Sequence, residues 1–125
     1  MLIKDALSRG CKEIILGVGG SATNDGGAGI FEALGGKLLD KKGESLEKGG
    51  GSLSSLESII PPQIPKSIKW KVACDVNNPL LGNFGSSTIY GPQKGASKTD
   101  IKILEKSLTQ FSKVLEKEKA KTMII

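Results

Sequence analysis

The residues best suited to chemistry lie in a glycine-rich loop at residues 17–27. The loop holds five glycines and four polar side chains, those of Ser21, Thr23, Asn24 and Asp25, and a short apolar run leads into it. Glycine costs conformational entropy unless a positive φ angle or the close approach of a ligand requires it. Such a loop exposes backbone N–H groups that suit an anion, and its amide and carboxylate groups suit a hydroxyl or a metal ion. We therefore predict that this loop is the centre of the site.

Two further polar segments, residues 75–79 and 91–95, supply complementary groups. In a parallel sheet the first of them would share an edge with the glycine loop, because the carboxyl ends of parallel strands meet there. Asp25 and Asp75 are candidates to bind Mg²⁺ or to deprotonate a hydroxyl group, and Lys94 is a candidate to neutralise a phosphate or a carboxylate. Gly19, Gly20 and Ser21 offer hydrogen-bond donors to a phosphate. Together these groups are the set that phosphoryl transfer requires.

Structural roles compete with each of these assignments. Asp25 would cap the helix that follows it, Asp75 would shape a turn through its side chain, and Lys94 would be an exposed loop lysine. Residues 77–79 would simply form a turn. The glycine loop would have no anion role, because such loops are common in α/β proteins. The sequence leaves these alternatives open.

Composition excludes several kinds of function. The chain has 125 residues, a net charge of +5 and no histidine, so Ser-His-Asp and Cys-His catalysis and the usual zinc sites are ruled out within it. One Trp, one Tyr and a single Arg argue against nucleic-acid binding. No apolar run approaches the roughly 20 residues of a membrane helix. Without a signal-peptide pattern, and with Cys11 and Cys74 outside metal-ligand spacing, we expect a cytoplasmic protein with reduced thiols.

The hydrophobic pattern predicts a single α/β fragment over residues 1–125. In chain order the expected elements are a helix at 2–9, a strand at 12–16, a helix at 28–34, a strand at 37–40, at least one helical turn at 53–60, a strand at 67–76 and a long helix capped by Ser97 or Thr99. Because strands alternate with helices, we expect a mixed or parallel sheet flanked by helices. On the last strand, one face at period two carries Ile68, Trp70, Val72 and Cys74. On the long helix, Ile101, Leu104, Leu108, Phe111 and Leu115 form a narrow stripe that should pack in the core, with a dimeric coiled coil as the alternative.

One nucleotide-binding motif matches in part, whereas the Walker A motif is absent. Residues 17–22 fit the loose dinucleotide form G-x-G-x-x-A, and Asp40 ends the second strand, where such a fold places its ribose-binding acid. A dinucleotide helix would begin near Ser21 and enclose the three glycines at 26–29, each costing roughly 1 kcal/mol relative to alanine. We therefore expect the helix to begin after Asp25, and a dinucleotide-binding module remains an alternative.

Three sequence blocks follow one another along the chain. Residues 19–27 read GGSATNDGG, residues 73–82 read ACDVNNPLLG and residues 90–96 read YGPQKGA, and an ALG follows the first block at 33–35. In composition, order and spacing these blocks resemble those of the bacterial glycerate kinase family. The resemblance covers residues 2–115.

The resemblance implies a two-domain α/β enzyme that transfers the γ-phosphoryl group of ATP, with Mg²⁺, to a hydroxyl of D-glycerate, giving phosphoglycerate and ADP. Ser21, Thr23 and Asn24 would then hold substrate or phosphate, with Asn77 and Gln93 as further candidates. Family members are much longer, so the chain resembles a central piece of such an enzyme. The missing portions on another chain are the expected partner, and the piece alone should be inactive if the absent domain forms half of the cleft. A non-catalytic nucleotide- or anion-binding module is the alternative.

Overall fold

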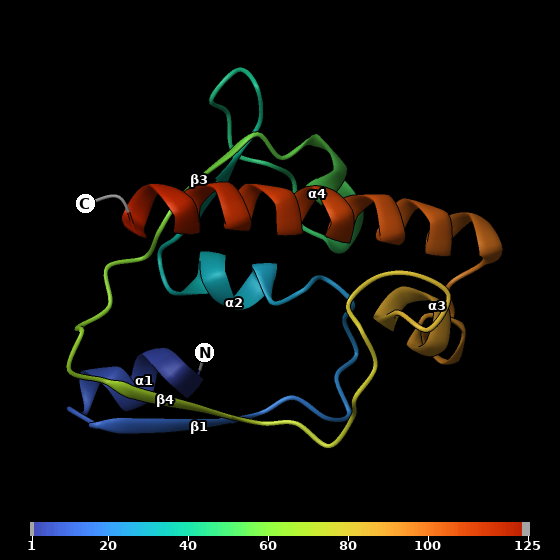
Figure 1. The fold of residues 1–125 in the computed structure, drawn as a ribbon. Helices are drawn as coiled ribbons and strands as arrows, with labels where there is room; N and C mark the ends of the chain where they lie inside the picture. Colours follow the sequence, from blue (N-terminus) through green and yellow to red (C-terminus); the bar gives the residue numbers. More distant parts are fainter. Residues whose placement is uncertain (1, 124–125) are drawn as a thin grey trace.

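The computed structural model describes residues 2–123, with side chains to residue 120 (Figure 1). In chain order its elements are α1 (Leu2–Ser8), β1 (Glu13–Gly17), α2 (Ala28–Ala33), β2 (Lys37–Leu39), the short 3-10 helix η1 (Gly50–Ser55), β3 (Ser58–Ile60), β4 (Lys69–Ala73), α3 (Ser86–Tyr90), a second 3-10 helix η2 (Pro92–Lys94) and α4 (Lys98–Met123). The ends of the predicted fragment at residues 1, 124 and 125 lie outside the described residues.

The strands form two separate sheets of two strands each. β1 and β4 run parallel, with Gly17 opposite Ala73, whereas β2 and β3 run antiparallel, with Leu38 opposite Ile59. Helices flank both sheets (Figure 1). The expected mixed α/β architecture with a parallel sheet flanked by helices is therefore confirmed.

The prediction of a helical turn at residues 53–60 is right for its first half only. The 3-10 helix η1 ends at Ser55, and the segment from Ser58 to Ile60 is strand β3. Ile59 is β-branched and 9% exposed, and it lies opposite the buried Leu38 of β2. A half-buried pleated surface suits such a side chain better than a helix does.

The hydrophobic core lies between α4 and the layer formed by α2, β2, η1 and β3. Its buried members are Ala28, Leu38, Leu53, Leu56, Ile59, Phe111 and Val114. The predicted face of α4 is confirmed in its middle, since Leu108 and Phe111 are buried. Leu115 at the end of the predicted stripe is 38% exposed, and Val114 takes its place in the core. A helix of 3.6 residues per turn brings both 111 and 114 to one face.

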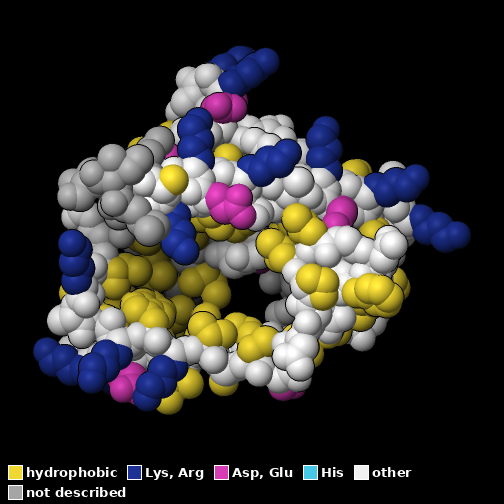
Figure 2. All heavy atoms as spheres, in the orientation of Figure 1, with side chains coloured by type: hydrophobic (Ala, Val, Ile, Leu, Met, Phe, Trp, Pro, Cys, Tyr) yellow, Lys and Arg dark blue, Asp and Glu magenta, His cyan; other side chains and the backbone are white. Residues whose placement is uncertain are grey.

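The β1–β4 sheet lies apart from this core. Every residue of β4 is exposed, Ile15 and Val72 are 66% and 63% exposed, and the sheet makes no extended contact with another helix or strand among the described elements. The predicted strand at 67–76 is thus present but shorter, and its apolar face is uncovered. Figure 2 shows hydrophobic side chains gathered in a hollow between this sheet and the α4 layer.

Within residues 2–123 no helix, α4 included, has the length and apolar character needed to cross a membrane.

Candidate functional site

The carboxyl ends of β1 and β4 bring two of the predicted loops together. The Val18 N–H donates to the Ala73 carbonyl oxygen at 3.1 Å, continuing the parallel ladder past Gly17. A Cβ built on Gly19 would lie 3.6 Å from Asp75 Oδ1. The Asp75 carboxylate is therefore beside the glycine loop, as expected for two loops at the same edge of a parallel sheet.

Asp25 caps the start of α2. Its Oδ1 accepts a hydrogen bond from the Gly27 N–H and its Oδ2 accepts one from the Gly29 N–H, both at 3.0 Å. The chain can turn back so sharply because Gly26 and Gly27 have φ angles of +61° and +87°, a region that side chains with a Cβ rarely adopt. The helix begins after Asp25, as predicted. The same hydrogen bonds mean that Asp25 itself, and no external anion, occupies the first donors of α2.

The donors left for an anion lie earlier in the loop. Within the described chain, no backbone N–H of residues 19–24 donates a hydrogen bond to the protein. Gly19, Gly20 and Ser21 are all exposed. A run of solvent-facing N–H groups without protein partners is suited to phosphate oxygens. The phosphate role of Gly19, Gly20 and Ser21 stays a prediction.

Lys94 reaches the glycine loop from η2. Its Nζ donates to the carbonyl oxygen of Thr23 at 2.8 Å and to Ser21 Oγ at 3.1 Å. On the other side of the loop, Asn24 Nδ2 donates at 2.9 Å to the fully buried hydroxyl of Ser87 in α3. The loop is therefore tied to two distant segments, and it carries a cation next to its unpaired N–H groups. Lys94 is not a free surface lysine.

A pocket of about 340 Å³ opens between these loops and the start of α4. Thr23, Asn24, Asp25 and Lys94 are among the residues that line it, so four of the predicted site residues share one cavity. Asp100 in the first turn of α4 also lines it. The Ser97 hydroxyl and N–H both donate to Asp100 Oδ2, and these hydrogen bonds hold the pKa of the Asp100 carboxyl below its ordinary value.

The two aspartates predicted to bind Mg²⁺ differ in whether their carboxylate oxygens already accept hydrogen bonds. Both oxygens of Asp25 already accept backbone hydrogen bonds, whereas the exposed Asp75 carboxylate has no hydrogen-bond or ion-pair partner among the described residues. No group of three or more carboxylate, Cys or His side chains gathers in the described chain. Mg²⁺ in phosphoryl-transfer sites commonly uses one or two carboxylates together with the substrate's phosphates. Asp75 fits that pattern and Asp25 fits it less well.

Some predicted residues are not drawn into the pocket. Asn77 and Gln93 are exposed, do not line this pocket, and make no side-chain hydrogen bond within the described chain. The neighbouring Asn78 has a structural role instead: its Nδ2 donates to the Phe84 carbonyl at 3.0 Å, and the Tyr90 hydroxyl donates to its Oδ1 at 2.7 Å. These bonds hold the loop that follows β4 against α3.

The dinucleotide-binding alternative does not agree with the topology. Such a fold needs β2 in the same sheet as β1, whereas here β2 pairs antiparallel with β3 in a separate sheet. Asp40 Oδ1 accepts hydrogen bonds from the N–H groups of Lys42 and Glu44, at 2.8 and 2.9 Å. It therefore closes the turn after β2 instead of standing free to bind a ribose.

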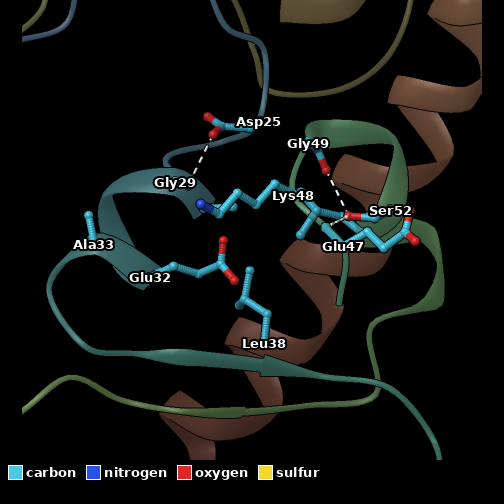
Figure 3. Close-up of a pocket in the computed structure, with 11 residues that line it drawn as sticks. Asp25, Gly29, Glu32, Ala33, Leu38, Glu47, Lys48, Gly49 and Ser52 are labelled. Carbon is cyan, nitrogen blue, oxygen red and sulfur yellow. Dashed lines mark hydrogen bonds between the residues drawn. The ribbon is translucent and has the colours of Figure 1, made fainter. Parts of the chain in front are cut away.

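A second pocket, of about 330 Å³, lies on the other side of Asp25 (Figure 3). It is bounded by α2 and by the segment from Glu47 to Leu53, and the charged side chains of Glu32 and Lys48 line it together. Neither was predicted from the sequence: Glu32 lies in the expected helix at 28–34, and Lys48 lies in a polar, glycine-rich segment that resembles a surface loop. The one available signal was a lysine placed directly before the three glycines at 49–51.

The fold and site together define an α/β protein with an exposed glycine-rich loop whose N–H groups at 19–24 have no protein partner in the described chain, a lysine at that loop and a carboxylate beside it. The family model described as the glycerate kinase family matches residues 1–124, and the chain belongs to this family. It is 48% identical over 124 residues to a glycerate kinase of Halalkalibacterium halodurans and 49% identical over 120 residues to glycerate 2-kinase of Escherichia coli K12. These matches cover 96% and 93% of this chain.

The solved structures give the same result. A Salmonella typhimurium LT2 protein assigned as glycerate kinase 2 is 44% identical and superposes with a TM-score of 0.87 over 93% of this chain. The chain covers 32% of that protein, and 32% and 31% of the two relatives above. It therefore spans about a third of the length of the proteins that it matches.

Proposed function

We propose that this chain is the central portion of a glycerate kinase and that it contributes the phosphate-binding part of the active site. The full enzyme would transfer the γ-phosphoryl group of ATP to a hydroxyl of D-glycerate. The observation that carries this proposal is the position of the Lys94 ammonium at the loop whose N–H groups at 19–24 have no protein partner. A cation and oriented N–H groups stabilise the charge that builds up on phosphate oxygens during such a transfer.

The other residues take roles that follow from their contacts. Asp75 is the proposed ligand for Mg²⁺, which would offset phosphate charge when bound, because its carboxylate is free and lies beside Gly19. Thr23 and Asn24 shape the pocket wall through the bonds that tie them to Lys94 and Ser87. Asp25 fixes the end of the loop to the start of α2 through its two hydrogen bonds, and it borders the pocket.

In the reaction, the glycerate hydroxyl oxygen bonds to the γ-phosphorus while the bond from that phosphorus to the bridging oxygen of ADP breaks. The hydroxyl proton passes to a carboxylate at the site, and we propose Asp25 or Asp75 for this role. Asn77 and Gln93 stay candidates for contacts with the part of the enzyme beyond this chain. The proposed setting is the cytoplasm, where Cys11 and Cys74 would remain the free thiols seen in the structure.

The test is ADP release with Mg-ATP and D-glycerate, for the chain alone and co-expressed with the remaining portions of a full-length relative. Turnover that appears only on co-expression, and that Asp75→Asn removes, supports the proposal. Glu57→Gln is the matched control, because Glu57 is an exposed carboxylate outside both pockets. Nucleotide binding without turnover in either arrangement would instead identify a non-catalytic nucleotide-binding module.

A further inference from the structure

The pocket between α2 and the 47–53 segment contains two opposite charges that are not paired. Figure 3 shows Lys48 and Glu32 extending from facing walls into the same space. Neither side chain has a hydrogen bond or an ion pair with any described residue. Opposite charges that share a cavity and remain apart leave room for a molecule that binds to both.

The rest of the lining limits what that molecule can be. Leu38, Leu53 and Ala28 form an apolar wall, with 2%, 1% and 5% of their surfaces exposed. A cavity of about 330 Å³ is at the small end of ligand pockets in proteins, which start near 300 Å³. The cavity thus fits a short carbon chain that carries an anionic group for Lys48 and a hydroxyl group for Glu32.

The place of the pocket relates it to the phosphate-binding loop. Asp25 and Gly49 line both this pocket and the one that contains Lys94. The two cavities therefore adjoin at Asp25 and Gly49, and each is lined by a lysine. A molecule in the first pocket would therefore lie next to the pocket that contains Lys94.

We propose that the Lys48–Glu32 pocket is the subsite for the hydroxy acid, with Lys48 binding the carboxylate and Glu32 accepting a hydrogen bond from a hydroxyl group. This inference rests on the proposed function and adds to it the place of the acceptor substrate. The nucleotide phosphates would lie at the glycine loop beside Lys94, and Asp25 borders both pockets. The specificity for a hydroxylated acid comes from the pair of opposite charges.

The test is calorimetric titration of the 125-residue chain with D-glycerate, with glycerol, which lacks the carboxylate, and with propionate, which lacks the hydroxyl groups. D-glycerate should bind at least tenfold more tightly than either of the others. Lys48→Gln should remove the advantage over glycerol, and Glu32→Gln the advantage over propionate. Lys41→Gln is the matched control, since Lys41 is an exposed lysine outside both pockets and should leave all three affinities unchanged.

Methyl NMR signals of Ala33, Leu38 and Leu53 should shift with saturation during the same D-glycerate titration. The inference is overturned if the wild-type chain shows no saturable D-glycerate binding, if Lys48→Gln and Lys41→Gln bind alike, or if the shifts appear only at residues 91–96. A separate titration with a non-hydrolysable ATP analogue reports on the proposed function. Nucleotide binding without D-glycerate binding would overturn the subsite alone, whereas loss of nucleotide binding would count against the proposed function.

Discussion

The Lys94 ammonium donates a hydrogen bond to the carbonyl oxygen of Thr23 at 2.8 Å, although 71 residues separate the two in the chain. With the second bond to Ser21 Oγ, it attaches η2 to the glycine loop. The ammonium has three protons, so one remains for a ligand in the pocket. Lys94 thus both holds the loop in place and leaves positive charge beside its free N–H groups.

Replacing Lys94 by methionine should weaken binding of a non-hydrolysable ATP analogue about 10- to 100-fold, because hydrogen bonds to a charged group contribute about 1.5–3 kcal/mol each. Titration calorimetry with Mg²⁺ present would measure the change. Lys98→Met is the matched control, since Lys98 is nearby, exposed and without a side-chain hydrogen bond among the described residues. Equal losses in the two variants would show that net charge, and not the contact with the loop, sets the affinity.

Local patterns in the sequence predicted the parallel juxtaposition of the loops at Gly19 and Asp75, because a polar segment follows each of two apolar strands. They also predicted that the helix begins after Asp25. They could not predict that β2 and β1 lie in different sheets, since that depends on the pairing of β2 with β3, in which Leu38 lies opposite Ile59. The charged residues Glu32 and Lys48 were missed for a similar reason: two residues 16 positions apart come to line one pocket only through tertiary packing.

Replacement of Asp25 should show how much its capping of α2 stabilises the fold. Asp25→Ala leaves the N–H groups of Gly27 and Gly29 without their acceptor, and loss of a cap costs about 0.5–2 kcal/mol of unfolding free energy. Asp25→Asn keeps one carbonyl oxygen and should lose less. Urea denaturation followed by circular dichroism would rank the three proteins. A stability of Asp25→Ala equal to the wild type would contradict the capping role.

Gly50 lies where a side chain would press on the glycine loop. A Cβ there would be 2.9 Å from the Asn24 carbonyl oxygen and 3.1 Å from Leu104 Cδ2. Gly50→Ala should therefore cost about 1–3 kcal/mol, as overpacking usually does, and should shift the loop. Gly51→Ala is the control, because its Cβ would meet only Ile103 Cγ2 at an ordinary 3.5 Å. Unfolding free energies that change equally for the two variants would count against this argument.

The cap of α4 should give the chain an acid-sensitive contribution to stability. Hydrogen bonds from the Ser97 hydroxyl and N–H lower the pKa of Asp100 in the fold. A carboxyl whose pKa is lower in the folded than in the unfolded chain stabilises the fold above its unfolded pKa, about 3.9, and this contribution is lost as the pH falls through the folded value.

The urea midpoint of the wild type should therefore exceed that of Asp100→Asn by a constant amount above about pH 5. The difference should shrink as the pH falls from there toward 3. In a Ser97→Ala background the pH-dependent part of this difference in urea midpoint should be smaller, because the hydrogen bond from the Ser97 hydroxyl is the main cause of the lowered pKa of Asp100. A difference that stays the same from pH 7 to pH 3 would refute the assignment.

The uncovered β1–β4 sheet should behave as a surface, although its sequence resembles a core strand. Val72 is 63% exposed, so Val72→Thr should change the unfolding free energy by less than about 0.5 kcal/mol. Leu38 is 2% exposed in the core, and Leu38→Ala should cost about 2–5 kcal/mol. Chemical denaturation would measure both. A loss at Val72 as large as that at Leu38 would mean that another element, or a second copy of the chain, covers the sheet in solution.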